Sequence, residues 1–180
     1  MIKVWDALVR VLHWSLVLVV SAAWLTRHGG AWVHEWLGYT ALLVVAMRVA
    51  WGFLSSGHAR FRSFVRSPAA TLAYARAALA HKEPRHVGHN PLGGWMIVAL
   101  LTMVAATGVS GWLYTTTMFW GDERVVEIHE ACSNVLFALV GLHLLGVLFT
   151  SVRQRENLVA AMICGRKRDD KRGDQRNGDV

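Results

Sequence analysis

Four long apolar stretches constrain this chain more than any other feature of its sequence. They run over residues 7–26, 36–54, 92–114 and 129–151. Each is close to the roughly 20 apolar residues that an α-helix needs to cross a hydrocarbon core. Because lipid offers no hydrogen bonds to the backbone, each stretch is expected to be helical. The sequence therefore predicts an all-α membrane protein, a four-helix transmembrane bundle.

The composition agrees with membrane spans that are flanked by basic segments. Hydrophobic residues make up 54% of the 180 residues, charged residues make up 17%, and the formal net charge is +7. No nucleic-acid-binding motif accompanies the positive charge, so we expect no nucleic-acid partner. The chain starts with a basic and then an apolar segment, like a signal peptide. A second span follows it, so we expect an uncleaved first helix.

The Lys and Arg residues outside the spans lie almost entirely on one side of the predicted bundle. On that side are Lys3, Arg10, Arg60, Arg62, Arg66, Arg76, Lys82, Arg85, Arg153, Arg155, Arg166, Lys167, Arg168, Lys171, Arg172 and Arg176. The other side has Arg27 and Arg124. Its acidic residues are Glu35, Asp122, Glu123 and Glu127. The positive-inside rule therefore predicts that the N- and C-termini are both cytoplasmic.

Short helices are expected on the cytoplasmic side. Pro68 follows Ser67 and favours the first position of a helix, so a surface helix is predicted over residues 69–81. A second short helix is predicted over residues 156–163. From Gly165 onward the chain is polar and charged, and we expect it to be disordered. The chain then divides into a bundle of residues 1–165 and a charged cytoplasmic tail of residues 166–180.

Four histidines in or beside the spans are the main candidate site residues. They are His13, His34, His129 and His143. Ionisable residues in spans are costly and usually functional. The direction of each span places His13 in the inner part of the bundle, and His34 and His129 at its outer end. His143 follows His129 by 14 residues and lies about 21 Å deeper on nearly the same helix face.

These depths predict two histidine pairs, one at each level. Ligation of a haem iron by two histidines needs one imidazole on each side of the porphyrin, from facing helices. A single histidine in a span is as often a packed, hydrogen-bonded residue, but two pairs matched in depth favour ligation. A zinc or copper site would gather its ligands at one level. We therefore predict two haem b groups, an outer one on His34 and His129 and an inner one on His13 and His143.

Three further residues are candidates for cofactor binding on the inner side. Arg48 and Arg10 could each pair with a haem propionate or extend to the membrane interface. His89 lies at the start of the third span. It could bind a quinone headgroup or a propionate, replace His13 as the inner ligand, or be an interfacial residue. Glycines near the histidines either admit a flat macrocycle or mediate ordinary helix packing.

Several segments together resemble the bacterial cytochrome b561 family, which includes the b-type subunits of nickel–iron hydrogenases and formate dehydrogenases. The matching segments are V-W-D-A-L-V-R-V-L-H-W at 4–14, H-E-W-L-G-Y at 34–39, R-V-A-W-G-F at 48–53, G-H-N-P-L-G-G at 88–94, and H-E-A through G-L-H between 129 and 143. The similarity spans roughly residues 1–167. In that family, the first-helix histidine pairs with the later histidine of the fourth helix, and the second-helix histidine pairs with the earlier one. The resemblance therefore implies the pairs His13 with His143 and His34 with His129, which the depths also predict.

The resemblance implies a di-haem b-type cytochrome of the bacterial inner membrane that exchanges electrons with ubiquinone or menaquinone. It implies a redox partner such as a c-type cytochrome or a hydrogenase. One family branch oxidises superoxide and reduces quinone, so a superoxide:quinone oxidoreductase is an alternative, as is a haem-free membrane anchor. An electron-transfer protein is favoured over a stand-alone enzyme. The oligomeric state is left open, with a homodimer as one option.

Overall fold

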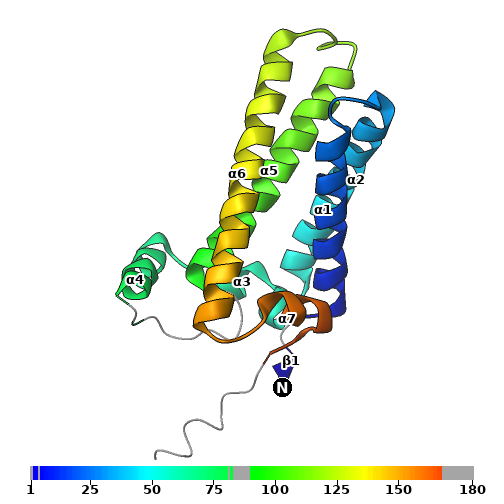
Figure 1. Cartoon of the computed structure of the whole chain (residues 1–180). Helices are drawn as coiled ribbons and strands as arrows, with labels where there is room; N and C mark the ends of the chain where they lie inside the picture. The colour runs from blue at the N-terminus through cyan, green and yellow to red at the C-terminus, as the bar shows by residue number, and fades with distance from the viewer. Residues whose placement is uncertain (1, 4, 81, 83–89, 168–180) are drawn as a thin grey trace, which may run out of the picture.

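The computed structural model describes residues 2–3, 5–80, 82 and 90–167, and four long helices dominate it (Figure 1). They are α1 (Ala7–Thr26), α2 (Ala31–Leu54), α5 (Pro91–Thr115) and α6 (Glu123–Arg153). By length and composition, all four can cross a membrane. The prediction of an all-α, four-helix transmembrane bundle is confirmed.

The four helices pack in sequence order, with α1 along α2, α2 along α5 and α5 along α6. The core consists of aliphatic side chains that all four helices contribute. Its buried members are Ala41, Val45, Leu101, Val104 and Leu136, with Leu16, Val19 and Val20 of α1 packed against them. The α1–α2 and α5–α6 connections lie at one end of the bundle, here called the loop end (Figure 1). The start of α1 and the end of α6 lie at the opposite end, here called the terminal end.

Polar caps set where the long helices begin. The Asp6 carboxylate accepts the Val9 backbone N–H at 2.8 Å at the start of α1. The Asp122 carboxylate accepts the Arg124 N–H at 2.9 Å at the start of α6. Helix α6 therefore begins six residues before the apolar stretch predicted from His129. Hydropathy marks only the part of a helix that lies in lipid, whereas the cap marks its first turn.

Short elements gather at the terminal end. They are η1 (Gly57–Ala59), α3 (Phe61–Phe64), α4 (Pro68–Leu79), α7 (Leu158–Cys164) and the strands β1 (Ile2–Lys3) and β2 (Arg166–Lys167). The predicted surface helix after Ser67 is present as α4, and the Ser67 hydroxyl accepts the Ala70 N–H. The second short helix begins two residues later than predicted because Asn157 caps it.

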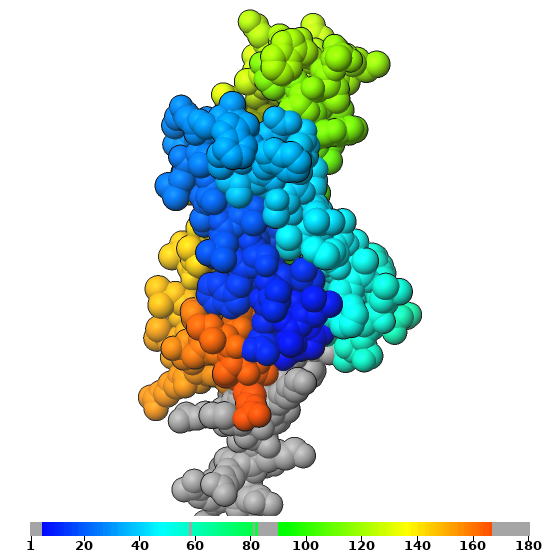
Figure 2. Space-filling model, turned by 90° about the vertical axis from the view of Figure 1, so that its right-hand side faces the viewer, coloured from blue at the N-terminus to red at the C-terminus, as the bar shows by residue number. Residues whose placement is uncertain are grey.

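Both ends of the described chain are tied together. Strands β1 and β2 pair antiparallel, and the Trp5 N–H donates to the Gly165 carbonyl at 3.2 Å. Arg10 donates to the carbonyl of Ile163, near the end of α7, which lies against the lower end of α1 (Figure 2). The first residues of the expected tail are thus ordered by backbone pairing, and residues 168–180 lie outside the described residues. Four spans cross the membrane an even number of times, so both ends of the described chain are required to lie at the same end of the bundle.

Asp6 also joins α1 to the end of α2. Its second carboxylate oxygen accepts the Trp51 indole N–H at 2.9 Å. We expect Asp6→Ala to lower the free energy of unfolding by about 2 kcal/mol, since a lost helix cap and an unsatisfied indole N–H cost about 1 kcal/mol each. Thermal unfolding in detergent measures the loss. Trp51→Phe is the matched control and should cost about half as much, because it keeps the cap; an Asp6→Ala variant as stable as the parent would contradict this role.

Candidate functional site

The loop end brings two of the predicted histidines face to face. His34 lies in the first turn of α2 and His129 in the second turn of α6. Their ring centroids are 6.1 Å apart, and the ring planes are 84° from parallel. These two residues, here called the loop-end pair, are 95 positions apart in the sequence. Their meeting agrees with the depths predicted from the sequence.

Each ring of the loop-end pair is oriented by a backbone carbonyl from a neighbouring helix. His34 Nδ1 donates to the Ala23 carbonyl of α1 at 2.9 Å. His129 Nδ1 donates to the Thr107 carbonyl of α5 at 3.0 Å. A carbonyl can only accept, so the proton of each neutral ring is on Nδ1 and the lone pair is on Nε2. Metal-ligating histidines are held in this way, with the non-ligating N–H bonded to a carbonyl or carboxylate.

The spacing of the loop-end pair fits two histidines that would hold one iron between them. Two metal–imidazole bonds of about 2 Å, plus roughly 1 Å from each nitrogen to its ring centre, separate the centres by about 6 Å. The observed 6.1 Å agrees with this sum. The two imidazole rings do not need to contact each other to keep this spacing, because the Ala23 and Thr107 carbonyls already hold each ring in place. The residues present therefore fit the predicted haem.

Small and polar residues of α5 and α2 surround the loop-end pair. Ser110 is 4% exposed and lies 3.2 Å from His129 Nδ1 while donating to the Thr107 carbonyl. A Cβ atom on Gly111 would come within 3.1 Å of His129 Cε1, so glycine lets this ring lie against α5. A Cβ atom on Gly38, one turn after His34, would meet nothing within 4 Å.

His13 of α1 and His143 of α6 form the second predicted pair, here called the terminal-end pair. His13 Nδ1 is buried, and it has no hydrogen-bond partner among the described residues. The Trp14 ring lies edge-on to the His13 ring, with centroids 5.3 Å apart. Within the described chain, His13 therefore lacks the orienting carbonyl that holds each ring of the loop-end pair.

Arg48 is the buried cation of the terminal end. It is 6% exposed, and its Nη1 atom has no hydrogen-bond partner within the described part of the chain. Its guanidinium lies 5.2 Å from the centre of the Phe61 ring. An unsatisfied guanidinium N–H fits a carboxylate of a bound group, such as a propionate.

The other two inner candidates have different outcomes. Arg10 donates to the Ile163 carbonyl, so this side chain holds α7 against α1. Its Nε atom is buried without a partner among the described residues, which leaves one donor for a bound group. His89 lies outside the described residues, and its proposed roles stay predictions.

The structure separates the roles of the glycines near the histidines. A Cβ atom on Gly108 would lie 2.7 Å from Leu42, so this glycine serves the close packing of α5 on α2. On Gly141 and Gly146, beside His143, an added Cβ atom would meet nothing within 4 Å. In the described segments, no three His, Cys, Asp or Glu side chains converge. A zinc site takes three or four such ligands, whereas a haem iron takes two.

Sequence reasoning missed the groups that orient the site. The Ala23 and Thr107 carbonyls belong to the backbone, so no residue type marks them. Asp6 carried a recognisable signal, because an acidic residue directly before an apolar helix is a typical cap. Its second bond, to Trp51 on another helix, has no such signal.

Comparison with known proteins agrees with this geometry. The family model described as prokaryotic cytochrome b561 matches residues 4–165, which is nearly the whole described bundle. No curated protein and no solved structure matches the chain. The match and the four apolar helices together indicate a multi-pass membrane protein. The chain belongs to the prokaryotic cytochrome b561 family, whose members are haem b proteins of membrane electron transfer.

Proposed function

We propose that this protein binds two haem b groups and carries electrons across the membrane between quinone and a redox partner. The observation that carries the proposal is the loop-end pair, in which His34 and His129 lie 6.1 Å apart with both Nδ1 atoms bonded to carbonyls. A bound haem supplies one-electron chemistry, as its iron changes between the ferric and ferrous states. The protein supplies the ligands, their orientation and a dry environment.

The second haem would lie at the terminal end, between His13 and His143. The proposed loop-end and terminal-end ligands on α6, His129 and His143, are 14 residues apart, so they lie at two levels about 21 Å apart along the helix. Arg48 supports this position, because its buried, unsatisfied guanidinium would neutralise a propionate. A cation beside a haem also favours the ferrous state over the more positively charged ferric state.

The proposed orientation places the terminal end in the cytoplasm of a bacterial cell, with the protein in the inner membrane. Described residues of the terminal end include Arg60, Arg62, Arg66, Arg76, Lys82, Arg155 and Arg166, and the positive-inside rule supports this direction. Quinone would react at the terminal end, near Arg48. The partner, a c-type cytochrome or a hydrogenase, would react at the loop end. The acidic residues there disfavour an anionic substrate such as superoxide.

The test begins with the purified full-length protein in detergent. Pyridine haemochrome analysis should find two haem b groups for each chain, and the reduced-minus-oxidised spectrum should show a b-type α-band. A quinol analogue should reduce both haems, with the rate measured by stopped flow. One haem per chain would contradict the two-site proposal, and haems that no quinol reduces would contradict the quinone step.

A further inference from the structure

Each carbonyl that orients the loop-end pair also accepts a hydroxyl from its own helix. The Ala23 carbonyl, which is bonded to one ring of the pair, accepts the Thr26 hydroxyl at 3.2 Å. The Thr107 carbonyl, which is bonded to the other ring, accepts the Ser110 hydroxyl at 3.0 Å. In both cases the hydroxyl is three residues further along the same helix. The same arrangement thus occurs twice, on α1 and on α5, and these two oxygens are here called the shared carbonyls.

The hydroxyl bond alone is ordinary, whereas the imidazole that joins it is not. Ser and Thr side chains within helices commonly donate to a carbonyl three or four residues earlier. Thr40 of α2 does so, because it donates to the Trp36 carbonyl at 2.8 Å, and no histidine of the described residues bonds to that oxygen. At the shared carbonyls, Ser110 is 4% exposed and Thr26 is half-buried. The protein therefore sets the strength of these bonds more than the solvent does.

A shared carbonyl forms a weaker bond to its imidazole than an unshared one. A carbonyl oxygen has two lone pairs, and in a helix the N–H four residues later ordinarily bonds to it. A hydroxyl therefore competes with the imidazole N–H for the same electron density. The bond on the non-ligating N–H makes a histidine a stronger electron donor to a metal, so weakening this bond makes it a poorer donor. A poorer donor favours ferrous over ferric iron and raises the reduction potential.

Two further contacts limit the size of this effect. Thr26 divides its one hydroxyl hydrogen between the shared carbonyl and the Ala22 carbonyl, which it meets at 2.9 Å. The Ser110 oxygen lies 3.2 Å from His129 Nδ1, so it is a second and longer acceptor for that N–H. The carbonyl bond at 3.0 Å dominates, because Ser110 directs its own hydrogen at the same carbonyl. Loss of both hydroxyls should therefore strengthen the imidazole–carbonyl bonds by less than one whole hydrogen bond.

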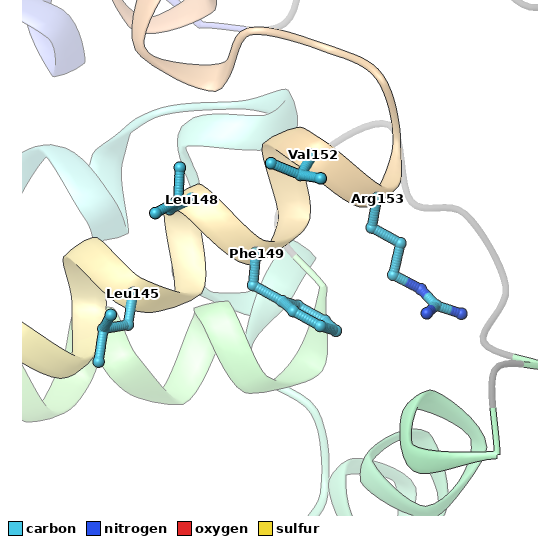
Figure 3. A pocket seen from close by; sticks show the side chains of 5 residues that line it. All are labelled: Leu145, Leu148, Phe149, Val152 and Arg153. Carbon is cyan, nitrogen blue, oxygen red and sulfur yellow. The ribbon is translucent and has the colours of Figure 1, made fainter.

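The terminal end provides an internal reference. Thr26 ends α1 at the loop end, 13 residues beyond His13, and His13 Nδ1 has no hydrogen-bond partner among the described residues. Beyond His143, α6 has an exposed hollow whose lining side chains carry no hydroxyl (Figure 3). They are Leu145, Leu148, Phe149, Val152 and Arg153. A change at Thr26 or Ser110 should therefore leave the terminal-end site as it is.

We propose that Thr26 and Ser110 are positioning residues that raise the reduction potential of the loop-end haem by sharing the carbonyls that orient its ligands. The inference rests on the proposed function, because it requires a haem between His34 and His129. Neither hydroxyl touches the iron, since each acts through a carbonyl and an imidazole. Two hydroxyls at corresponding positions adjust both ligands of one haem in the same direction.

The test is a redox titration of the haem-loaded protein in detergent, in which the loop-end haem is the one that His129→Ala loses. In the double variant Thr26→Val, Ser110→Ala, the ratio of ferrous to ferric loop-end haem at a fixed potential should fall about threefold. This is a potential lower by about 30 mV, because a tenfold change corresponds to about 59 mV for one electron. The electron paramagnetic resonance signal of the oxidised loop-end haem should shift as well. The terminal-end haem should keep its potential and its signal.

Matched variants separate this role from a structural one. Thr26→Ser with Ser110→Thr keeps both hydroxyls and should keep the parent potential. Thr40→Val removes a hydroxyl from an unshared carbonyl at the same end of the bundle and should change neither haem. If the double variant loses haem, Thr26→Val alone, with nearly the parent volume, should still lower the potential.

The outcomes distinguish this inference from the function on which it rests. A double variant with two haems and the parent potential would overturn the role of the hydroxyls and leave the proposed function intact. An equal shift in Thr40→Val, or an equal shift of the terminal-end haem, would also overturn it. A parent protein without two haems, or a His129→Ala variant that keeps both, would contradict the proposed function instead.

Discussion

Replacing His129 by alanine is expected to remove one haem from the protein and leave the other in place. His129 and His34 would ligate the same iron, and a haem iron held by one histidine in a site built for two binds far more weakly. His34→Ala should therefore produce the same loss and the same difference spectrum. The double variant should lose no more haem than either single variant, because residues that act as a unit are not additive.

The terminal-end pair should behave in the same way but lose the other haem. His13→Ala and His143→Ala should each remove the haem that the His129 variant retains. The measurements are the haem content by pyridine haemochrome and a redox titration that resolves the two haems. A variant with His34 and His143 both replaced should contain no haem. If the His34 and His129 variants lost different haems, the proposed pairing would be wrong.

Two controls keep this test meaningful if a variant folds poorly. His28→Ala removes an exposed histidine that accepts a hydrogen bond from Arg27, and it should keep both haems. His129→Gly leaves room at the ligand position, so added imidazole should restore the missing haem spectrum. A His129→Gly variant that imidazole does not restore, while its unfolding midpoint is normal, would count against ligation by this residue.

Gly94→Ala is expected to destabilise the protein by about 1–3 kcal/mol, the usual cost of overpacking a close contact. A Cβ atom on Gly94 would come within 2.5 Å of the Phe64 carbonyl oxygen and within 3.1 Å of its carbon. Both are backbone atoms, so the contact cannot be relieved by a change of side-chain rotamer. The chain around α3, or the start of α5, would have to move. The direction of the change in stability is informative, because alanine in place of glycine otherwise stabilises a helix.

The matched control is Gly141→Ala in α6. A Cβ atom there would meet nothing within 4 Å, and Gly141 is exposed. Its unfolding midpoint should equal or exceed that of the parent, since the substitution adds no clash and alanine has the higher helix propensity. Thermal unfolding in one detergent, followed by circular dichroism, compares the two variants. A Gly94→Ala protein as stable as Gly141→Ala would contradict the close approach of α3 to α5.

Much of this fold follows from local properties of the sequence. Hydropathy over about 20 residues predicts each span, because the requirement to satisfy the backbone in lipid acts on each segment separately. The short helix after Ser67 follows from a cap and a proline at adjacent positions. Even the meeting of His34 with His129 follows from the sequence, because an alternating up-and-down path converts sequence position into depth. Ligation itself stays a prediction that the histidine variants test.

The tertiary structure alone decided the contacts that depend on how each helix is rotated and how closely it approaches its neighbour. The carbonyls of Ala23 and Thr107 orient the loop-end pair from two other helices, and every residue type has such a carbonyl. From the sequence, Arg48 and Arg10 could each pair with a propionate or extend to the membrane interface. In the structure Arg48 is buried, whereas Arg10 binds the end of α7. The sequence determined the four spans and the depth of their histidines. Packing between distant segments determined which atoms meet, because that depends on the shapes of side chains that are not neighbours in the chain.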